Sequence, residues 1–246
     1  MVNENRFDRF AYSASHDLKQ PLRNVRSFAN VLTNHLRQNS SLDENSEEYL
    51  NYILDSISSM EVLVNDLSTF STLDARLGQK SVLQLTSFLE LEEFKLNDRH
   101  PDLNISIKHD SLPELEVYPE IVKILFQKLI ANAVKFRSEP NVNISITGKE
   151  TADAWEFSIE DNGIGINQNF DKDIFQPFVK YHTSSEVMGS GLGLAICKKA
   201  IELHDGKIWY DLNKEQGTTF HFNLKKSKDR YRANLEENGQ RNTSGY

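Results

Sequence analysis

Two long stretches near the start of the chain repeat apolar residues at alternating steps of three and four, the heptad pattern of packed helices. The first runs from Glu4 to about Arg37 and the second from Glu44 to about Leu73. The short polar segment 38–42 between them predicts a turn, and either Asp43 or Asn45 is placed to cap the second helix. These stretches predict a helical hairpin. Its seam positions are Ala11, Ala14, Leu18, Pro21, Val25, Phe28, Leu32 and His35 in the first helix, and Leu50, Ile53, Ile57, Met60, Val64 and Leu67 in the second.

A hairpin of this length has a longer apolar seam than its two helices can bury against each other. We therefore expect two copies to form a homodimer with a four-helix bundle. Residues 1–74 are assigned to this dimerisation hairpin. Residues 75–81 lose the heptad pattern and contain Gly78, which predicts a linker.

From residue 82 onward the pattern alternates between short strands and helices, which predicts an α/β sandwich over residues 82–225. The charged segment 226–246 is nearly free of apolar residues, and we expect it to be disordered. The predicted strands are 104–108, 142–147, 155–159, 207–210 and 218–224, and the predicted helices are 87–97, 119–136 and 192–204.

The composition excludes several classes of protein. A formal net charge of −8 argues against a protein that binds nucleic acid through its phosphates. The single cysteine, Cys197, excludes an internal disulfide and a cysteine-based zinc site, and it fits a cytoplasmic location. No apolar run approaches the roughly 20 residues of a membrane span, and residues 1–10 are too polar for a signal peptide.

His16 falls on the side of the first helix that points away from the predicted seam, so its side chain should be exposed. Asp17 is its neighbour and Gln20 lies one turn further along the same side. An imidazole that a carboxylate orients is a competent nucleophile toward phosphorus. Pro21 removes a helix hydrogen bond beside this group and should kink or loosen the helix. Taken alone, His16 is better explained as an ordinary surface histidine on a solvated helix face.

The stretch from Ser15 to Arg23, with the sequence SHDLKQPLR, resembles the phosphoacceptor box of histidine kinases, especially the phytochrome-like subgroup. The resemblance implies that His16 is phosphorylated and that Asp17 is its orienting base. Gln20 occupies the position that helps to place water when the phosphorylated partner is dephosphorylated. Whether the protein also dephosphorylates its partner therefore stays open.

Four further segments of the second domain have residue types that suit a nucleotide. Asn132 and Lys135 lie about one turn apart on a predicted helix, where an amide oxygen suits Mg²⁺ and an ammonium suits a phosphate. Asp161 follows a predicted strand and can accept a hydrogen bond from an exocyclic amine. The other segments are an Ile-Phe-Gln-Pro-Phe run at 174–178, followed by a polar loop that predicts a lid, and a glycine-rich start of a helix at 189–194.

Each of these segments alone has an ordinary structural explanation, but in this order they resemble the N, G1, F and G2 boxes of the histidine-kinase ATPase domain. The resemblance implies an ATP-binding α/β sandwich in which Asn132 binds Mg²⁺, Lys135 a phosphate and Asp161 the adenine amine. Thr218 would lie near the adenine. The residues that would shape the rest of the site are Gly163, Gly165, Phe175, Phe178, Gly189, Gly191 and Gly193.

Two positions depart from the family pattern. Lys128 stands where the first asparagine of the N box is usual, which puts metal binding and turnover in doubt. Glu215 replaces the usual first glycine of the last glycine-containing box, Gly217 to Phe220.

The resemblance as a whole predicts a protein histidine kinase of a two-component system. ATP would phosphorylate His16, and the aspartate of a response-regulator receiver domain would accept the phosphoryl group. A sensor domain is expected upstream in a longer parent chain. Two alternatives stay open, a signalling scaffold of the same fold with little or no turnover and an ATP-driven conformational switch of the gyrase or chaperone type.

Overall fold

The computed structural model describes residues 2–38, 43–166, 173–180, 189–212 and 216–226. Its internal contacts divide the chain into two units, and each is described by itself. The first unit comprises Met1–Ala75 with Asp173–Ile196, and the second comprises Arg76–Lys172 with Cys197–Tyr246. The predictions for the tail 227–246, for the lid residues 181–188 and for Glu215 lie outside the described residues.

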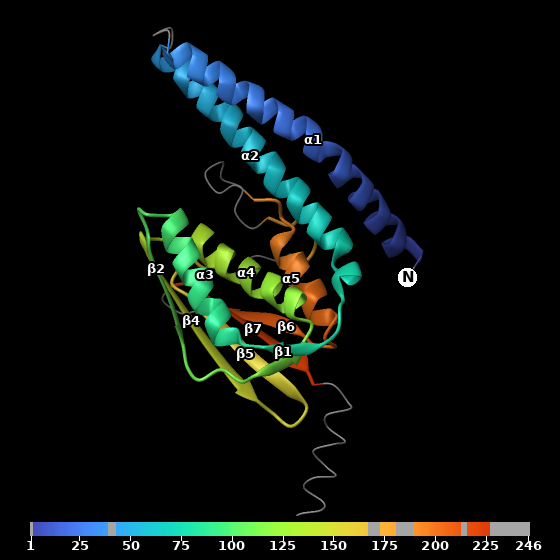
Figure 1. Ribbon diagram of the computed structural model, residues 1–246. Coiled ribbons are helices and arrows are strands. Elements are labelled where there is room, and N and C mark those ends of the chain that lie inside the picture. Colours follow the sequence, from blue (N-terminus) through green and yellow to red (C-terminus); the bar gives the residue numbers. More distant parts are fainter. Residues whose placement is uncertain (1, 39–42, 167–172, 181–188, 213–215, 227–246) are drawn as a thin grey trace, which may run out of the picture. The chain divides into compact units, whose positions relative to one another are not determined.

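The first unit contains the predicted hairpin, whose helices lie side by side in Figure 1. Helix α1 spans Val2–Gln38 and continues through Pro21, while helix α2 spans Glu44–Thr72. Of the two predicted caps, Asp43 caps α2, because its Oδ1 accepts a hydrogen bond from the Ser46 backbone N–H at 2.8 Å. The hydrogen bonds from Ser46 also lower the pKa of Asp43.

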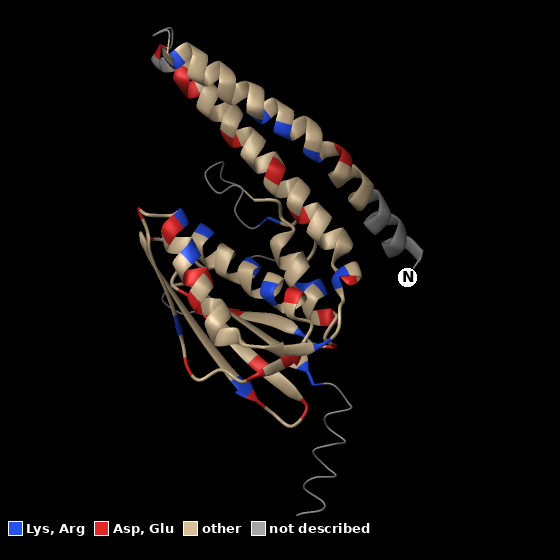
Figure 2. Ribbon diagram, in the orientation of Figure 1, with Lys and Arg blue, Asp and Glu red and all other residues tan. Residues whose placement is uncertain are grey.

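The two helices of the hairpin have opposite charge. Helix α2 contains six Asp and Glu residues and no Lys or Arg, whereas α1 contains six Lys and Arg residues and three acidic ones. In Figure 2 the ribbon of α2 is red at several positions, and blue positions mark the described part of α1. Among the described side chains, two ion pairs join the helices, Arg26 to Glu61 and Arg37 to Glu47, each with an N–O distance of 2.7 Å. Opposite charges on facing helices favour this pairing in this register.

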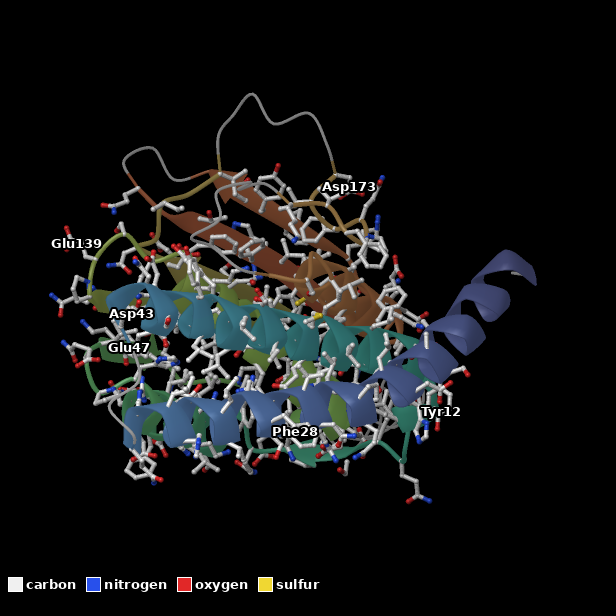
Figure 3. The ribbon with its side chains drawn as sticks, turned by 90° about the horizontal axis from the view of Figure 1, so that it is seen from above. Tyr12, Phe28, Asp43, Glu47, Glu139 and Asp173 are labelled. Atoms are coloured by element: carbon white, nitrogen blue, oxygen red, sulfur yellow. The ribbon has the colours of Figure 1, made fainter. Side chains whose placement is uncertain are left out.

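The hairpin buries only part of its seam. Of the predicted seam residues, Ala11, Leu50, Ile57 and Val64 are buried. Many other apolar side chains are exposed, including Phe28, which Figure 3 labels on α1. The apolar side chains of the hairpin that remain exposed are Tyr12, Leu18, Val25, Phe28, Val31, Leu32, Tyr49, Tyr52, Ile53, Met60, Val62 and Leu63.

The second unit is built on a five-stranded sheet with the order β2-β4-β5-β7-β6. Strands β2 and β4 pair in parallel, and the other neighbours pair antiparallel. The predicted strands are all present, with small differences at their ends. They are β2 (Asn104–His109), β4 (Asn141–Glu150), β5 (Ala154–Asp161), β6 (Ile208–Leu212) and β7 (Thr218–Lys225).

A second sheet pairs two strands that the sequence did not predict, β1 (Ser81–Leu83) and β3 (Leu115–Val117). Each has three residues, which is too short for a recognisable alternation. The helices α3 (Leu85–Arg99), α4 (Pro119–Lys135) and α5 (Gly193–Glu202) match the three predicted ones.

One face of the five-stranded sheet is covered by α3 and α4 (Figure 1). Strand β7 alternates buried and half-buried residues along its length, as a sheet with one covered face requires. On the covered face, the rings of Phe126, Phe157 and Phe222 pack with centroids 5.1–5.6 Å apart. None of the described helices combines the length and apolar composition that a membrane span requires.

Candidate functional site

His16 is exposed on α1, as its position in the heptad predicts. Its side chain is 78% exposed and that of Asp17 is 75% exposed. The His16 Nδ1 atom lies 3.2 Å from the Asp17 Oδ1 atom. Because a carboxylate only accepts hydrogen bonds, a hydrogen bond at this contact requires the imidazole proton on Nδ1, and in that neutral tautomer the Nε2 lone pair is directed away from Asp17. Gln20 is exposed one turn further on and donates its amide hydrogen to Asn24 at 3.1 Å.

The side of α1 next to His16 is fixed against α2. Ser15 is buried, and Lys19 donates a hydrogen bond to the Ser68 hydroxyl of α2 at 3.2 Å. A groove of about 250 Å³ begins between the helices at this level and exposes both cationic and acidic groups. Its lining residues are Lys19, Leu22, Arg23, Glu61, Val64 and Asn65.

Asp161 is the last residue of β5, and its carboxylate joins two segments of the second unit. The Asp161 Oδ1 atom accepts hydrogen bonds from the backbone N–H of Gly163 at 2.8 Å and of Thr218 at 3.3 Å. Thr218 is buried at the start of β7, beside the end of β5, because Glu160 pairs with Thr219 in the sheet register. Burial raises the pKa of Asp161, and these two hydrogen bonds oppose that shift.

The glycines after β5 allow close backbone contacts. A Cβ atom at Gly163 would lie 2.5 Å from the carbonyl oxygen of Phe136, the residue after α4. That oxygen also accepts a hydrogen bond from the Ile164 N–H at 2.9 Å. Gly165 has a φ of +72° and passes the Gly217 carbonyl, which a Cβ would approach to 3.0 Å. The turn after Asp161 is therefore packed against the end of α4.

The last turn of α4 contains Asn132 and Lys135, both half-buried. The Lys135 ammonium lies 4.6 Å from the centroid of the Phe136 ring. Lys128 is half-buried one turn before Asn132 and lies on the same side of the helix. The C-terminal end of a helix carries partial negative charge, which suits a cation. The described residues contain no group of three or more His, Cys, Asp or Glu side chains that could enclose a metal.

The remaining predicted residues belong to the first unit. Phe178 donates its backbone N–H to the Gly191 carbonyl at 2.9 Å. Phe178 has a φ of 65° and Gly191 a φ of 72°, and a Cβ at Gly191 would lie 2.9 Å from the Phe178 Cα. The Phe178 side chain is half exposed, whereas that of Phe175 is buried. Gly189 precedes the buried Ser190, and Gly193 begins α5.

Three residues with close contacts to these segments were not among the predicted site residues. Gly217 passes the backbone of Asp161 so closely that a Cβ would lie 1.9 Å from its carbonyl oxygen. Its place in the last glycine-containing segment was a usable signal. Ser190 and Asp66 form a buried hydrogen bond. No local pattern indicates that contact.

Two family models match the chain. Residues 8–76 match the His Kinase A (phospho-acceptor) domain. Residues 118–228 match the ATPase family described as histidine kinase-, DNA gyrase B- and HSP90-like. His16 lies in the first match, and Asn132, Asp161 and Thr218 lie in the second.

Among curated proteins, the chain is 38% identical over 216 residues to cyanobacterial phytochrome A of Nostoc sp., covering 88% of this chain and 28% of the relative. It is 35% identical over 216 residues to phytochrome-like protein Cph1 of Synechocystis sp., covering 88% of this chain and 29% of that protein. The chain thus spans less than a third of the length of these relatives.

Among solved structures, full-length ShkA in complex with AMPPNP aligns with a TM-score of 0.64 and 24% identity, covering 88% of this chain and 45% of ShkA. The histidine kinase AdeS of Acinetobacter baumannii aligns with a TM-score of 0.54 and 21% identity, covering 85% of this chain and 97% of AdeS. At these identities the likeness concerns the fold. With its phospho-acceptor hairpin followed by an ATPase domain, the chain is the catalytic core of a sensor histidine kinase.

Proposed function

We propose that this chain uses ATP to phosphorylate its own His16 and passes the phosphoryl group to the aspartate of a response-regulator receiver domain. One observation carries the proposal most directly. The exposed imidazole of His16, oriented by Asp17, lies in a phospho-acceptor domain on the same chain as a matched ATPase domain.

The contact between His16 and Asp17 defines the nucleophile. With the proton held on Nδ1, the Nε2 lone pair attacks the γ-phosphorus of ATP, an N–P bond forms and the bond to the β,γ-bridging oxygen breaks, which releases ADP. Asp17 stabilises the positive charge that develops on the imidazole. In the second step a carboxylate oxygen of the receiver attacks the same phosphorus and regenerates neutral His16. Gln20, exposed beside His16, would orient a water molecule if the core also dephosphorylates its partner.

For ATP binding we propose residues of two glycine-containing segments, 161–165 at the end of β5 and 189–193 at the start of α5. Asp161 would accept a hydrogen bond from the adenine amine next to Thr218, with Gly163 and Gly165 allowing the base to approach. Gly189, Gly191 and Gly193 would present backbone N–H groups to the phosphates beside Phe175 and Phe178. The complex of ShkA with AMPPNP supports a triphosphate as the ligand of this fold.

A single amide oxygen, that of Asn132, at the end of α4 fits Mg²⁺, which typically takes one or two protein ligands with phosphate oxygens and water. The ion would neutralise charge on the transferring phosphoryl group, and Lys135 would neutralise a further phosphate oxygen.

The remaining proposals concern organisation and partners. The exposed apolar face of the hairpin supports a homodimer with a four-helix bundle, and the groove beside His16 supports docking of the receiver there. The phytochrome relatives are more than three times as long as the matched region, which supports an upstream sensor domain. We retain residues 1–74 as the hairpin, 75–81 as the linker and 82–225 as the ATPase domain, and propose a cytoplasmic location.

Incubation with γ-labelled ATP and Mg²⁺ tests the phosphotransfer step. Wild type should acquire an acid-labile, base-stable label, and His16→Ala should acquire none, whereas His35→Ala, an exposed histidine of the same helix, should label normally. Label that persists in His16→Ala would contradict the assignment.

Nucleotide binding is tested separately by titrating wild type and Asp161→Asn with AMPPNP. The amide also offers an NH₂ group where the adenine amine needs an acceptor, so binding should weaken strongly while the fold persists. Binding without any phosphohistidine would instead favour a signalling scaffold, and ATP hydrolysis without phosphohistidine would favour a conformational switch.

A further inference from the structure

A buried hydrogen bond joins the dimerisation helix α2 to the glycine segment that precedes α5. The Ser190 hydroxyl donates to the Asp66 Oδ2 atom at 2.5 Å, and both residues belong to the first unit. Asp66 is 6% exposed and Ser190 is 8% exposed. A carboxylate held in so little solvent interacts more strongly with its neighbours than a surface carboxylate does.

The Ser190 hydroxyl makes a second hydrogen bond. The Ser190 Oγ atom accepts a hydrogen bond from the Leu192 backbone N–H at 3.0 Å. A serine hydroxyl has one proton to donate, and here it points at Asp66. Both the Ser190 O–H and the Leu192 N–H, two donors in the glycine segment, are therefore engaged within the protein.

An anionic phosphate that entered this segment would need such donors and would meet the negative charge of Asp66. A hydroxyl cannot give its proton to Asp66 and to a phosphate at once. Like charges in a poorly solvated site also repel. Asp66 thus opposes phosphate binding both through Ser190 and through its own charge.

The position of Asp66 also links this contact to the helix that carries the phosphoacceptor. Ser68, two residues further along α2, accepts the hydrogen bond from Lys19 of α1, and Lys19 lies three residues after His16. A shift of α2 along α1 would therefore change the contact with Lys19 and the contact with Ser190 together.

We propose that Asp66 is an autoinhibitory residue of this core, which withholds the Ser190 hydroxyl from the nucleotide phosphates until α2 moves. The inference rests on the proposed ATP binding and deepens it, because it names a residue of the dimerisation hairpin as a regulator of the nucleotide site. Release of Ser190 from Asp66 makes the Ser190 hydroxyl proton available to a phosphate.

Isothermal titration of the full chain with AMPPNP and Mg²⁺ tests the proposal through binding alone. Asp66→Ala should bind about tenfold more tightly than wild type, the factor expected when one hydrogen bond to a charged group no longer competes. Asp66→Asn keeps the shape and removes the charge, and it should also bind more tightly. Asp55→Asn removes an exposed charge from the same helix and should leave the affinity unchanged.

A double-mutant cycle distinguishes the contact from a general effect of charge. In the Ser190→Ala background, Asp66→Ala should give a much smaller gain, because the hydroxyl that Asp66 withholds is already absent. An equal gain in both backgrounds would overturn the role of Ser190. Unchanged or weaker binding of the two Asp66 variants, with wild-type circular dichroism, would overturn the proposal itself.

The same titrations distinguish a failure of the proposed ATP binding from a failure of the role of Asp66. If neither wild type nor any Asp66 variant binds AMPPNP, ATP binding is wrong and the inference falls with it. If all bind with the same affinity, ATP binding stands and only the role of Asp66 is rejected.

Discussion

The hairpin and the sheet bury their apolar residues to very different extents. In the second unit, Phe126 and Phe222 are 0% exposed and pack against each other with ring centroids 5.6 Å apart. In the hairpin, Phe28 is 74% exposed and Tyr49 is 65% exposed. The sheet and its helices complete their core within one chain, whereas the hairpin has an apolar face that needs another surface. The two regions should therefore respond differently to mutation.

The largest effect is expected in the sheet core. Phe126→Ala removes a ring that packs against Phe157 and Phe222 and should lower the free energy of unfolding of the ATPase domain by about 3–5 kcal/mol. Denaturant unfolding followed by tryptophan fluorescence measures this loss, because both tryptophans lie in this unit. Phe126→Leu should lose much less. A small loss for alanine would mean that this core is not complete in one chain.

The apolar face of the hairpin should control assembly rather than folding of the sheet. Phe28→Glu places a carboxylate on that face and should weaken the proposed dimer by about 2 kcal/mol, roughly thirtyfold in Kd. Sedimentation over a range of concentrations measures the change. Phe94→Glu, at a 72% exposed phenylalanine of α3, is the matched control and should leave the dimer intact. Equal weakening by the two variants would mean that the exposed face of the hairpin is no more important for assembly than the surface of α3.

A smaller, pH-dependent effect should appear in the second unit. His204 is buried, accepts a hydrogen bond from the Tyr118 N–H at 3.2 Å through Nε2, and contacts the Ala200 carbonyl through Nδ1 at 2.9 Å. It thereby joins the start of α4 to the end of α5. Burial lowers the pKa of His204.

The sign of the pH effect follows from this lowered pKa. Above about pH 6.5, the pKa of an unfolded histidine, both states are neutral and the stabilisation is complete. As pH falls below that value the unfolded state gains a proton first, so stability is lost until the folded pKa is passed. Unfolding of wild type and His204→Gln from pH 8 to pH 5 checks this, since the glutamine variant should show the shallower decline. Parallel curves would exclude His204 as the cause.

The smallest effect is expected at the ion pair between the helices. Arg26 contacts both Glu61 and the Ser58 hydroxyl, but its side chain and that of Glu61 are about a third exposed. Arg26→Ala should therefore cost under about 1 kcal/mol, as partly exposed pairs do. Hydrogen exchange of α1 and α2 amides measures the change, with Lys123→Ala in α4 as the control. A loss of several kcal/mol would show that the ionic contacts hold the hairpin more than its apolar contacts do.

The helical hairpin was predictable because heptads report directly on helix faces. The same pattern predicted that His16 is exposed, since its position relative to Ala11 and Leu18 fixes its direction on the helix. Asp43 was one of two predicted caps, and only the hydrogen bond to Ser46 distinguishes it from Asn45.

Contacts between distant segments were less accessible from sequence. Asp161 and Thr218 are 57 residues apart and meet because of the register between β5 and β7, which alternation alone does not determine. The family resemblance predicted that both residues lie near the adenine, but it did not explain how the two segments come into contact. The hydrogen bond between Asp66 and Ser190 joins residues 124 apart, and neither residue stands out from its local pattern. The strands β1 and β3 were not predicted, because three residues are too few to show the alternation of a strand.

The opposite charges of α1 and α2 have a consequence for how two copies can meet. Two α2 helices placed face to face would bring twelve carboxylates together without a single Lys or Arg between them. An arrangement that alternates α1 and α2 around the bundle instead sets each acidic helix beside basic ones. Long-range repulsion of this kind acts before apolar surfaces touch and fades within about 8 Å at physiological salt. In the proposed dimer these charges would select the orientation of the second copy during approach, and low ionic strength should make that selection stricter.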